Sequence, residues 1–156
     1  FFMPRRQWPP APTRGIPKAP CPALLPGLMA SNYAQSLAFY TQLAGFSVIY
    51  DRPEESFAML GNPCGARLMI EGITATGRLW TVGDMQRPYG RGINLQIEVE
   101  DAEALLQHFL HVQHPIYLPL EEKWYRRGAQ ETGNRQFIVQ DPDGYLLRFF
   151  QDLGLR

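Results

Sequence analysis

The sequence predicts an α+β fold made of two similar modules, each with the order βαβββ. Asn32 and Asp101, residue types that often cap helix N-termini, lie 69 positions apart. The apolar runs that follow the two predicted helices begin at Phe46 and Pro115, which are also 69 positions apart. Matches in this order indicate an internal repeat. One such module cannot cover its own sheet, so we expect two modules to combine, either within one chain or across a dimer.

Each predicted module closes with a β-hairpin. Residues 137–150 read FIVQDPDGYLLRFF, in which the turn 141–144 (DPDG) separates two apolar runs. The segment 62–65 (NPCG) is its counterpart in the first half. When residues are counted on from the two turns, Met69 in the first half and Arg148 in the second fall at equivalent positions. Because Arg148 lies between apolar neighbours in the middle of a strand, we expect it to face either water or a cavity.

The remaining elements follow from apolar periodicity and from glycine, proline and capping signals. In the first half we expect strands over residues 23–29, 46–50, 56–60 and 66–71 and a helix over 33–43. In the second half we expect strands over 93–99 and 115–118, a helix over 102–112, and a polar loop over 121–134. The chain then divides into an N-terminal arm (1–22), a first module (23–72), a connector (73–91) and a second module (92–153). The arm holds seven of the fourteen prolines, so we expect it to be extended.

Composition narrows the range of partners. The net charge is zero, but four basic residues are the only charges in positions 1–20, and residues 21–156 therefore carry a net charge of −4. An acidic body argues against nucleic-acid binding. The two cysteines, Cys21 and Cys64, are isolated and are expected to be reduced thiols in a cytoplasmic protein. No apolar run approaches the length of a membrane span, so we expect no membrane partner.

Two motifs resemble those of a known superfamily. Residues 32–46 (NYAQSLAFYTQLAGF) resemble the first-helix signature of the vicinal-oxygen-chelate superfamily, which includes glyoxalase and bleomycin-resistance proteins. Residues 141–147 (DPDGYLL) resemble its closing hairpin. The resemblance spans about residues 23–153 and implies paired βαβββ modules whose mixed sheets curl into a cup with the helices outside. It also implies a ligand or metal inside that cup.

The resemblance further implies where a metal would be held, on the first and fourth strands of each module. By the repeat, these positions fall on Leu25, Met69, Asn94 and Arg148. Leu and Met supply no hard donor, Asn is a poor ligand, and Arg places a permanent positive charge beside the cation. We therefore expect no metal site of this kind and no cofactor.

Strand alternation assigns the remaining candidates to the cup. The positions that do not face the helices carry charged and amide groups among apolar ones, which suits a small organic ligand. Three aromatic residues on the long predicted loops are candidates for a rim or lid. The predicted ligand-binding residues are Arg67, Met69, Glu71, Asn94, Gln96, Glu98, Arg148 and Phe150, with Trp80, Trp124 and Tyr125 on the loops.

Three hypotheses for function follow. The first is a metal-free homodimer, similar to the bleomycin-resistance branch, that sequesters a drug-like or aromatic compound without catalysis and so confers antibiotic resistance. The resemblance also implies that the arm is exchanged between protomers. The second is a metal-dependent lyase, dioxygenase or thiol transferase of the same superfamily, which metal analysis of the purified protein would reveal. The third is a protein whose cup is filled by its own side chains and which acts only by association.

Overall fold

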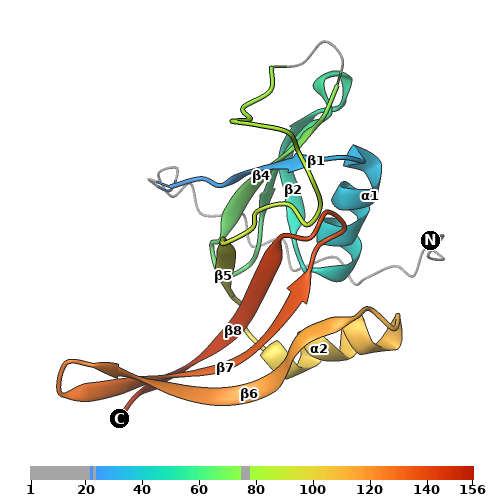
Figure 1. Ribbon diagram of the computed structural model, residues 1–156. Coiled ribbons are helices and arrows are strands. Elements are labelled where there is room, and N and C mark those ends of the chain that lie inside the picture. The colour runs from blue at the N-terminus through green and yellow to red at the C-terminus, as the bar shows by residue number, and fades with distance from the viewer. Residues whose placement is uncertain (1–21, 23, 75–77) are drawn as a thin grey trace.

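A computed structural model describes residues 22, 24–74 and 78–156, and it contains two mixed four-stranded sheets, each with a helix (Figure 1). The first module consists of β1 (Gly27–Ala30), α1 (Tyr33–Ala38), the π-helical turn η1 (Phe39–Leu43), β2 (Ser47–Arg52), the 3-10 turn η2 (Pro53–Glu55), β3 (Phe57–Gly61) and β4 (Arg67–Gly72). The second consists of β5 (Asn94–Glu98), α2 (Ala102–His111), β6 (Ile116–Arg127), β7 (Gln130–Gln140) and β8 (Leu146–Leu155). The strand orders are β1-β4-β3-β2 and β5-β8-β7-β6, which confirms the predicted α+β class.

The strand registers reproduce the repeat that the sequence predicts. β1 pairs in parallel with β4, and Gly27 lies beside Met69. β5 pairs in parallel with β8, and Gln96 lies beside Arg148. Because Gly27 and Gln96 are 69 positions apart, Met69 and Arg148 occupy equivalent places in the two sheets.

The two predicted helix caps are also present. The side chain of Asn32 accepts a hydrogen bond from the backbone N–H of Gln35 at 3.0 Å. The side chain of Asp101 accepts one from the backbone N–H of Ala104 at 2.9 Å. Each bond satisfies a donor that the first turn of a helix leaves without an internal partner.

The first predicted strand and the predicted polar loop differ most from the structure. The first strand begins at Gly27 rather than at residue 23, which lies outside the described residues together with residues 1–21 of the predicted arm. The polar loop expected over residues 121–134 is wrong, because β6 and β7 continue through this region as a long hairpin. The end of this hairpin extends away from α2 (Figure 1). Residues 125–130 at its tip are exposed, and the sequence there lacks the apolar alternation that signals a half-buried strand.

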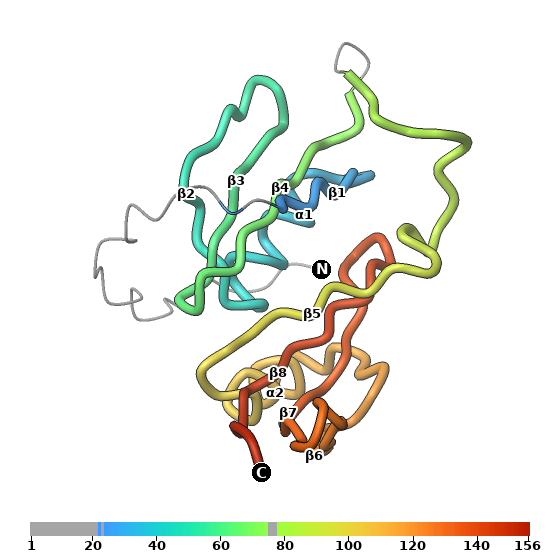
Figure 2. Tube along the Cα trace, turned by 90° about the vertical axis from the view of Figure 1, so that its left-hand side faces the viewer, coloured from blue at the N-terminus to red at the C-terminus, as the bar shows by residue number. Residues whose placement is uncertain are grey.

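The two modules share one apolar core. The ring centroid of Phe39 lies 6.0 Å from that of Phe109 on α2, which in turn lies 5.8 Å from Phe137 on β7. Leu68 and Leu147 come from the central strands of the two sheets and belong to the same buried cluster. The modules lie one above the other, with β5 between them in the second view (Figure 2). The side of each sheet that faces its helix is thus the side that is packed against the core.

The turn of the last hairpin joins the modules through polar contacts. The carboxylate of Asp143 is buried and accepts hydrogen bonds from the backbone N–H of Ser31 at 2.9 Å and from the guanidinium of Arg87 at 3.0 Å. Ser31 precedes α1, and Arg87 belongs to the connector. This carboxylate therefore holds three distant segments together. No helix among the described residues has the length and apolarity needed to cross a membrane.

Candidate functional site

The candidate site lies on the outer face of the sheets, which we define as the face directed away from the shared core. Paired residues of neighbouring strands lie on the same face, so the registers determine which side chains are grouped together. On the first sheet the outer face carries Met29, Tyr50, Phe57, Met59, Arg67, Met69 and Glu71. On the second sheet it carries Asn94, Gln96, Glu98, Glu121, Gln136, Ile138, Leu146, Arg148 and Phe150.

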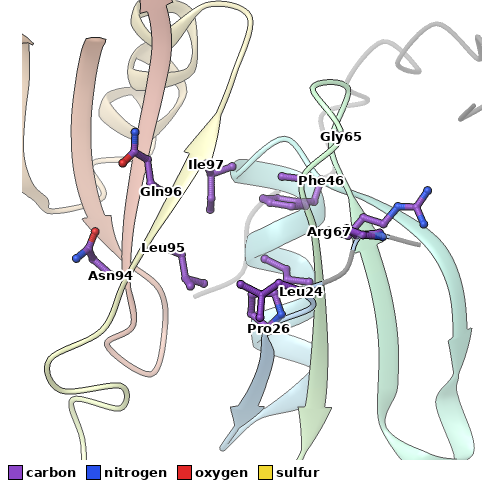
Figure 3. Close-up of a pocket in the computed structure, with 12 residues that line it drawn as sticks. Leu24, Pro26, Phe46, Gly65, Arg67, Asn94, Leu95, Gln96 and Ile97 are labelled. Atoms are coloured by element: carbon purple, nitrogen blue, oxygen red, sulfur yellow. The ribbon is translucent and has the colours of Figure 1, made fainter. Parts of the chain in front are cut away.

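The two outer faces of one chain do not face each other. Leu95 and Ile97 extend from β5 toward the first module, where Phe46 lies opposite them (Figure 3). Gln96 extends to the other side of β5, and Arg67 extends away from the seam on the far side of β4 (Figure 3). A single protomer therefore presents the sequence-predicted residues as two separate groups.

The outer face of the first sheet is apolar, and flexible methionine side chains form much of it. Met29 and Met59 are buried, Met69 is partly buried, and the Phe57 ring lies 5.9 Å from that of Tyr50. Methionine side chains are flexible and polarisable, so they adapt to flat or irregular apolar partners. Glu71 lies beside Met29 in the register and is the acidic group of this face.

The outer face of the second sheet is centred on Arg148. Its side chain is partly buried, and its guanidinium donates to Oε1 of Gln96, which lies beside it on β5. Among the described residues, the buried Nε of Arg148 has no hydrogen-bond partner. A buried donor without a partner costs free energy, so this position favours an added acceptor.

Gln136 is a functional candidate that the sequence reasoning missed. It is only 2 % exposed, and its Nε2 donates to Oε1 of Glu121 at 2.9 Å and to the hydroxyl of Tyr125 at 2.8 Å. Its Oε1 is buried and has no partner among the described residues. Gln136 on β7 is paired with Phe150 on β8, which is two residues along the strand from Arg148 and on the same face. In the sequence, the alternation of Gln136 and Ile138 with apolar Phe137 is the signal that could have placed Gln136 on the outer face.

The three aromatic residues predicted for a rim are separated in the structure. Tyr125 lies on β6 rather than on a loop and reaches the outer face through Gln136. Trp124 lies on the opposite face of β6, where its ring packs so closely on Gly133 that an added Cβ would lie 2.6 Å from it. Trp80 lies on the connector, is 66 % exposed, and has the Arg78 guanidinium 4.4 Å from its ring centroid.

Arg148 lines neither of two hollows that the described residues form. One of about 390 Å³ lies at the seam between the modules, where Pro26 and Phe46 face Leu95 and Ile97 (Figure 3). Three sequence-predicted residues, Arg67, Asn94 and Gln96, also border it. The labelled side chains of these three point away from the space between the modules (Figure 3). The lining is thus mainly apolar.

The second hollow, of about 410 Å³, lies between the end of η1, the turn at residues 62–64 and the start of α2. Cys64 and His108 border it. Burial, together with the carboxylates of Glu98 and Glu100, raises the pKa of the Cys64 thiol, so this cysteine is not activated as a nucleophile. Within the described residues, no group of three or more His, Cys, Asp or Glu side chains is placed to hold a metal ion.

Comparisons with known proteins agree on the fold. No family model matches the chain. A bleomycin resistance protein from Geobacillus stearothermophilus is 28 % identical over 139 residues, covering 83 % of this chain and 96 % of that protein. TioX from Micromonospora sp. ML1 has a TM-score of 0.61 at 21 % identity, covering 83 % of this chain and 98 % of its own. A bleomycin resistance determinant encoded on transposon Tn5 has a TM-score of 0.55 at 19 % identity, with coverages of 83 % and 97 %.

Proposed function

The chain belongs to the vicinal-oxygen-chelate superfamily, and we propose that it binds and sequesters a small drug-like or aromatic compound without transforming it. Sequestration requires affinity but no reacting groups. The similarity to bleomycin resistance proteins supports this role and a contribution to antibiotic resistance. The observation that carries the proposal is a pair of buried polar atoms, Arg148 Nε and Gln136 Oε1, that have no partners among the described residues and lie on one sheet face beside Phe150.

The composition of the two outer faces supports ligand binding. The first sheet contributes an apolar wall of Met59, Met69 and Phe57. The second contributes hydrogen-bonding groups, Arg148 and Gln136, at defined positions. Sites for small organic ligands combine apolar walls with a few well-placed polar groups. Each face alone supplies one half of that combination.

A homodimer is part of this proposal. Because the two outer faces of one protomer are directed away from each other, an enclosed site needs the first sheet of one protomer and the second sheet of another (Figure 3). Two-fold symmetry would then form two identical sites, since each protomer offers both faces. In such a dimer Met69 of one protomer and Arg148 of the other belong to the same site.

The residues present do not fit the divalent metal that enzymes of this superfamily use. The first-strand positions lie two residues beyond Leu25 and Asn94, which were expected from the sequence. The side-by-side positions on the first and fourth strands carry Gly27 with Met69 in one sheet and Gln96 with Arg148 in the other. None of these four supplies a carboxylate or an imidazole. The guanidinium of Arg148 is permanently charged and already bonded to the amide oxygen of Gln96. The guanidinium of Arg148 would repel a divalent metal ion at this place, so these residues do not support a metal-dependent catalytic step.

A thermal-shift screen tests the proposal. The full chain would be heated with bleomycin-type glycopeptides, aromatic dyes and other planar drugs, because a compound that binds only the native state raises the melting temperature. We expect at least one aromatic compound to raise it in the wild type and in an Arg135→Ala control, and to do so less in Arg148→Ala. Arg135 lies on the opposite face of the same sheet, paired with Glu122. A screen without any stabilising compound would contradict the proposal.

A further inference from the structure

The electrostatic environment of Arg148 restricts the charge of the ligand. The described residues contain ion pairs for Arg52, Arg87, Arg135 and Arg156, but none for Arg148. The partner that Arg148 does have is Gln96, whose amide is neutral. The guanidinium therefore keeps its full positive charge at a partly buried position without a carboxylate in contact.

Burial distinguishes this cation from the acidic groups around it. Glu98 and Glu121 lie one row away on the same outer face, and both are exposed. Water solvates an exposed carboxylate well, so replacing that water with a cationic ligand gains little. Arg148 is partly buried and its Nε has no partner among the described residues, so its guanidinium is less well solvated than these carboxylates and gains more from an anionic acceptor.

The surroundings of Arg148 favour a planar apolar body attached to that anion. Ile138 lies beside Arg148 in the register, and the next row carries Phe150 opposite Gln136. Tyr125 covers the same row, because its hydroxyl accepts from the Gln136 amide. Aromatic and aliphatic side chains around one guanidinium form a surface on which a ring can lie flat.

We propose that the ligand class of this site is aromatic carboxylates, or equally planar organic anions, with the anionic group bound by the guanidinium of Arg148. The inference rests on the proposed function, since it names the chemistry of the compound that is sequestered. It adds a preference to the proposed function: the site binds an anion more tightly than a cation of the same shape.

Three probes of one shape and different charge test this inference in the wild-type chain. 2-Naphthoate, 2-naphthamide and 2-naphthylmethylammonium would each be titrated calorimetrically at pH 7 and one salt concentration. We expect 2-naphthoate to bind most tightly and the ammonium compound most weakly. Equal or tighter binding of the ammonium compound would overturn the inference and leave the proposed function standing. If none of the three binds and the drug screen is also blank, the proposed function itself fails.

A pair of arginine variants assigns the preference to its residue. Arg148→Gln is expected to weaken 2-naphthoate binding roughly 10- to 100-fold, because a hydrogen bond to a charged group is lost. It should change 2-naphthamide binding only a few-fold. Arg135→Gln, on the opposite face, should change neither. If Arg148→Gln kept the full preference for 2-naphthoate, the assignment would be wrong. The wild-type series decides the ligand charge even if this variant does not fold.

Discussion

The hydroxyl of Tyr40 in the first module donates a hydrogen bond of 2.9 Å to the carboxylate of Asp141 in the second, although 101 positions separate them. The other oxygen of Asp141 accepts from the backbone N–H groups of Asp143, Gly144 and Tyr145, each at 2.9 Å. Burial, and next the nearby charge of Asp141, raise the pKa of Tyr40 well above its usual value, so its hydroxyl remains a donor. One carboxylate thus shapes the closing turn and ties it to the helix of the other module.

Removing this hydroxyl should loosen the contact between the modules. In Tyr40→Phe, one oxygen of the buried Asp141 loses its partner, and we expect the free energy of unfolding to fall by about 1–3 kcal/mol. Urea unfolding followed by fluorescence measures the change. Tyr117→Phe is the matched control, because the Tyr117 side chain is 63 % exposed. Equal stability of the two variants would show that the Tyr40 bond contributes nothing.

The closing turn also depends on the absence of a side chain at position 144. Gly144 has φ +101°, and an added Cβ would lie 2.5 Å from Cβ of Pro88 in the connector. Gly128 has φ +65°, but an added Cβ there would meet open space. We expect Gly128→Ala to cost roughly 1–2 kcal/mol from backbone conformation alone. Gly144→Ala should cost more, about 2–5 kcal/mol, because the clash is added. If urea unfolding showed that the two variants lose the same free energy of unfolding, the close approach of residue 144 to Pro88 would be contradicted.

Stability should depend on pH through His114. Its Nε2 donates to the carbonyl oxygen of Gln140 at 2.9 Å, and its ring lies 5.5 Å from Phe39 and 5.4 Å from Phe109. Burial lowers the pKa of His114 below 6.5, with the hydrogen bond partly opposing the shift. Between 6.5 and the lowered value the unfolded chain binds the proton more readily, so stability is lost as the pH falls through this window.

The measurement is urea unfolding at pH 5 and pH 8 for the wild type and for His114→Gln. The wild type should be less stable at pH 5, and the difference between the two pH values should be smaller in the variant. Burial also lowers the pKa of His108, so some dependence should persist. A variant with the same pH dependence as the wild type would remove His114 from this account.

Cys64 should react slowly with alkylating reagents. Because burial and two nearby carboxylates raise the pKa of its thiol above 9.0, less thiolate is present at pH 8 than in a free cysteine. In a Cys21→Ser background, iodoacetamide should modify the native chain more slowly than the urea-unfolded chain at the same pH. Mass spectrometry follows the reaction. Equal rates in the two states would contradict this environment for the thiol.

The repeat and the central strands could be predicted from sequence because their physical signals are local. N-caps, turns and apolar runs depend on neighbouring residues, and counting from the two hairpin turns correctly aligned Met69 with Arg148. The β6–β7 hairpin was missed because residues 125–130 at its tip are exposed and mostly polar, so they show no apolar alternation. Gln136 is buried, and it was missed because its partners Glu121 and Tyr125 were assigned to a loop.

The direction of the two outer faces could not be predicted from the strands. Alternation separates the two faces of one strand, but it does not say how one sheet is turned relative to another. That relationship depends on the shared core, in which Phe39 packs against Phe109 and Tyr40 bonds to Asp141. The residues predicted to line one cup therefore lie in two groups within the chain.

The central claim is that one ligand site is built from the first sheet of one protomer and the second sheet of its partner. The most direct test co-expresses two differently tagged variants, Met69→Glu and Arg148→Glu, purifies the mixed dimer, and titrates it with the compound that gives the largest shift in the screen. We predict no binding to either variant alone and recovery of one site, half the wild-type number, in the mixed dimer. A mixed dimer that binds nothing would contradict the claim.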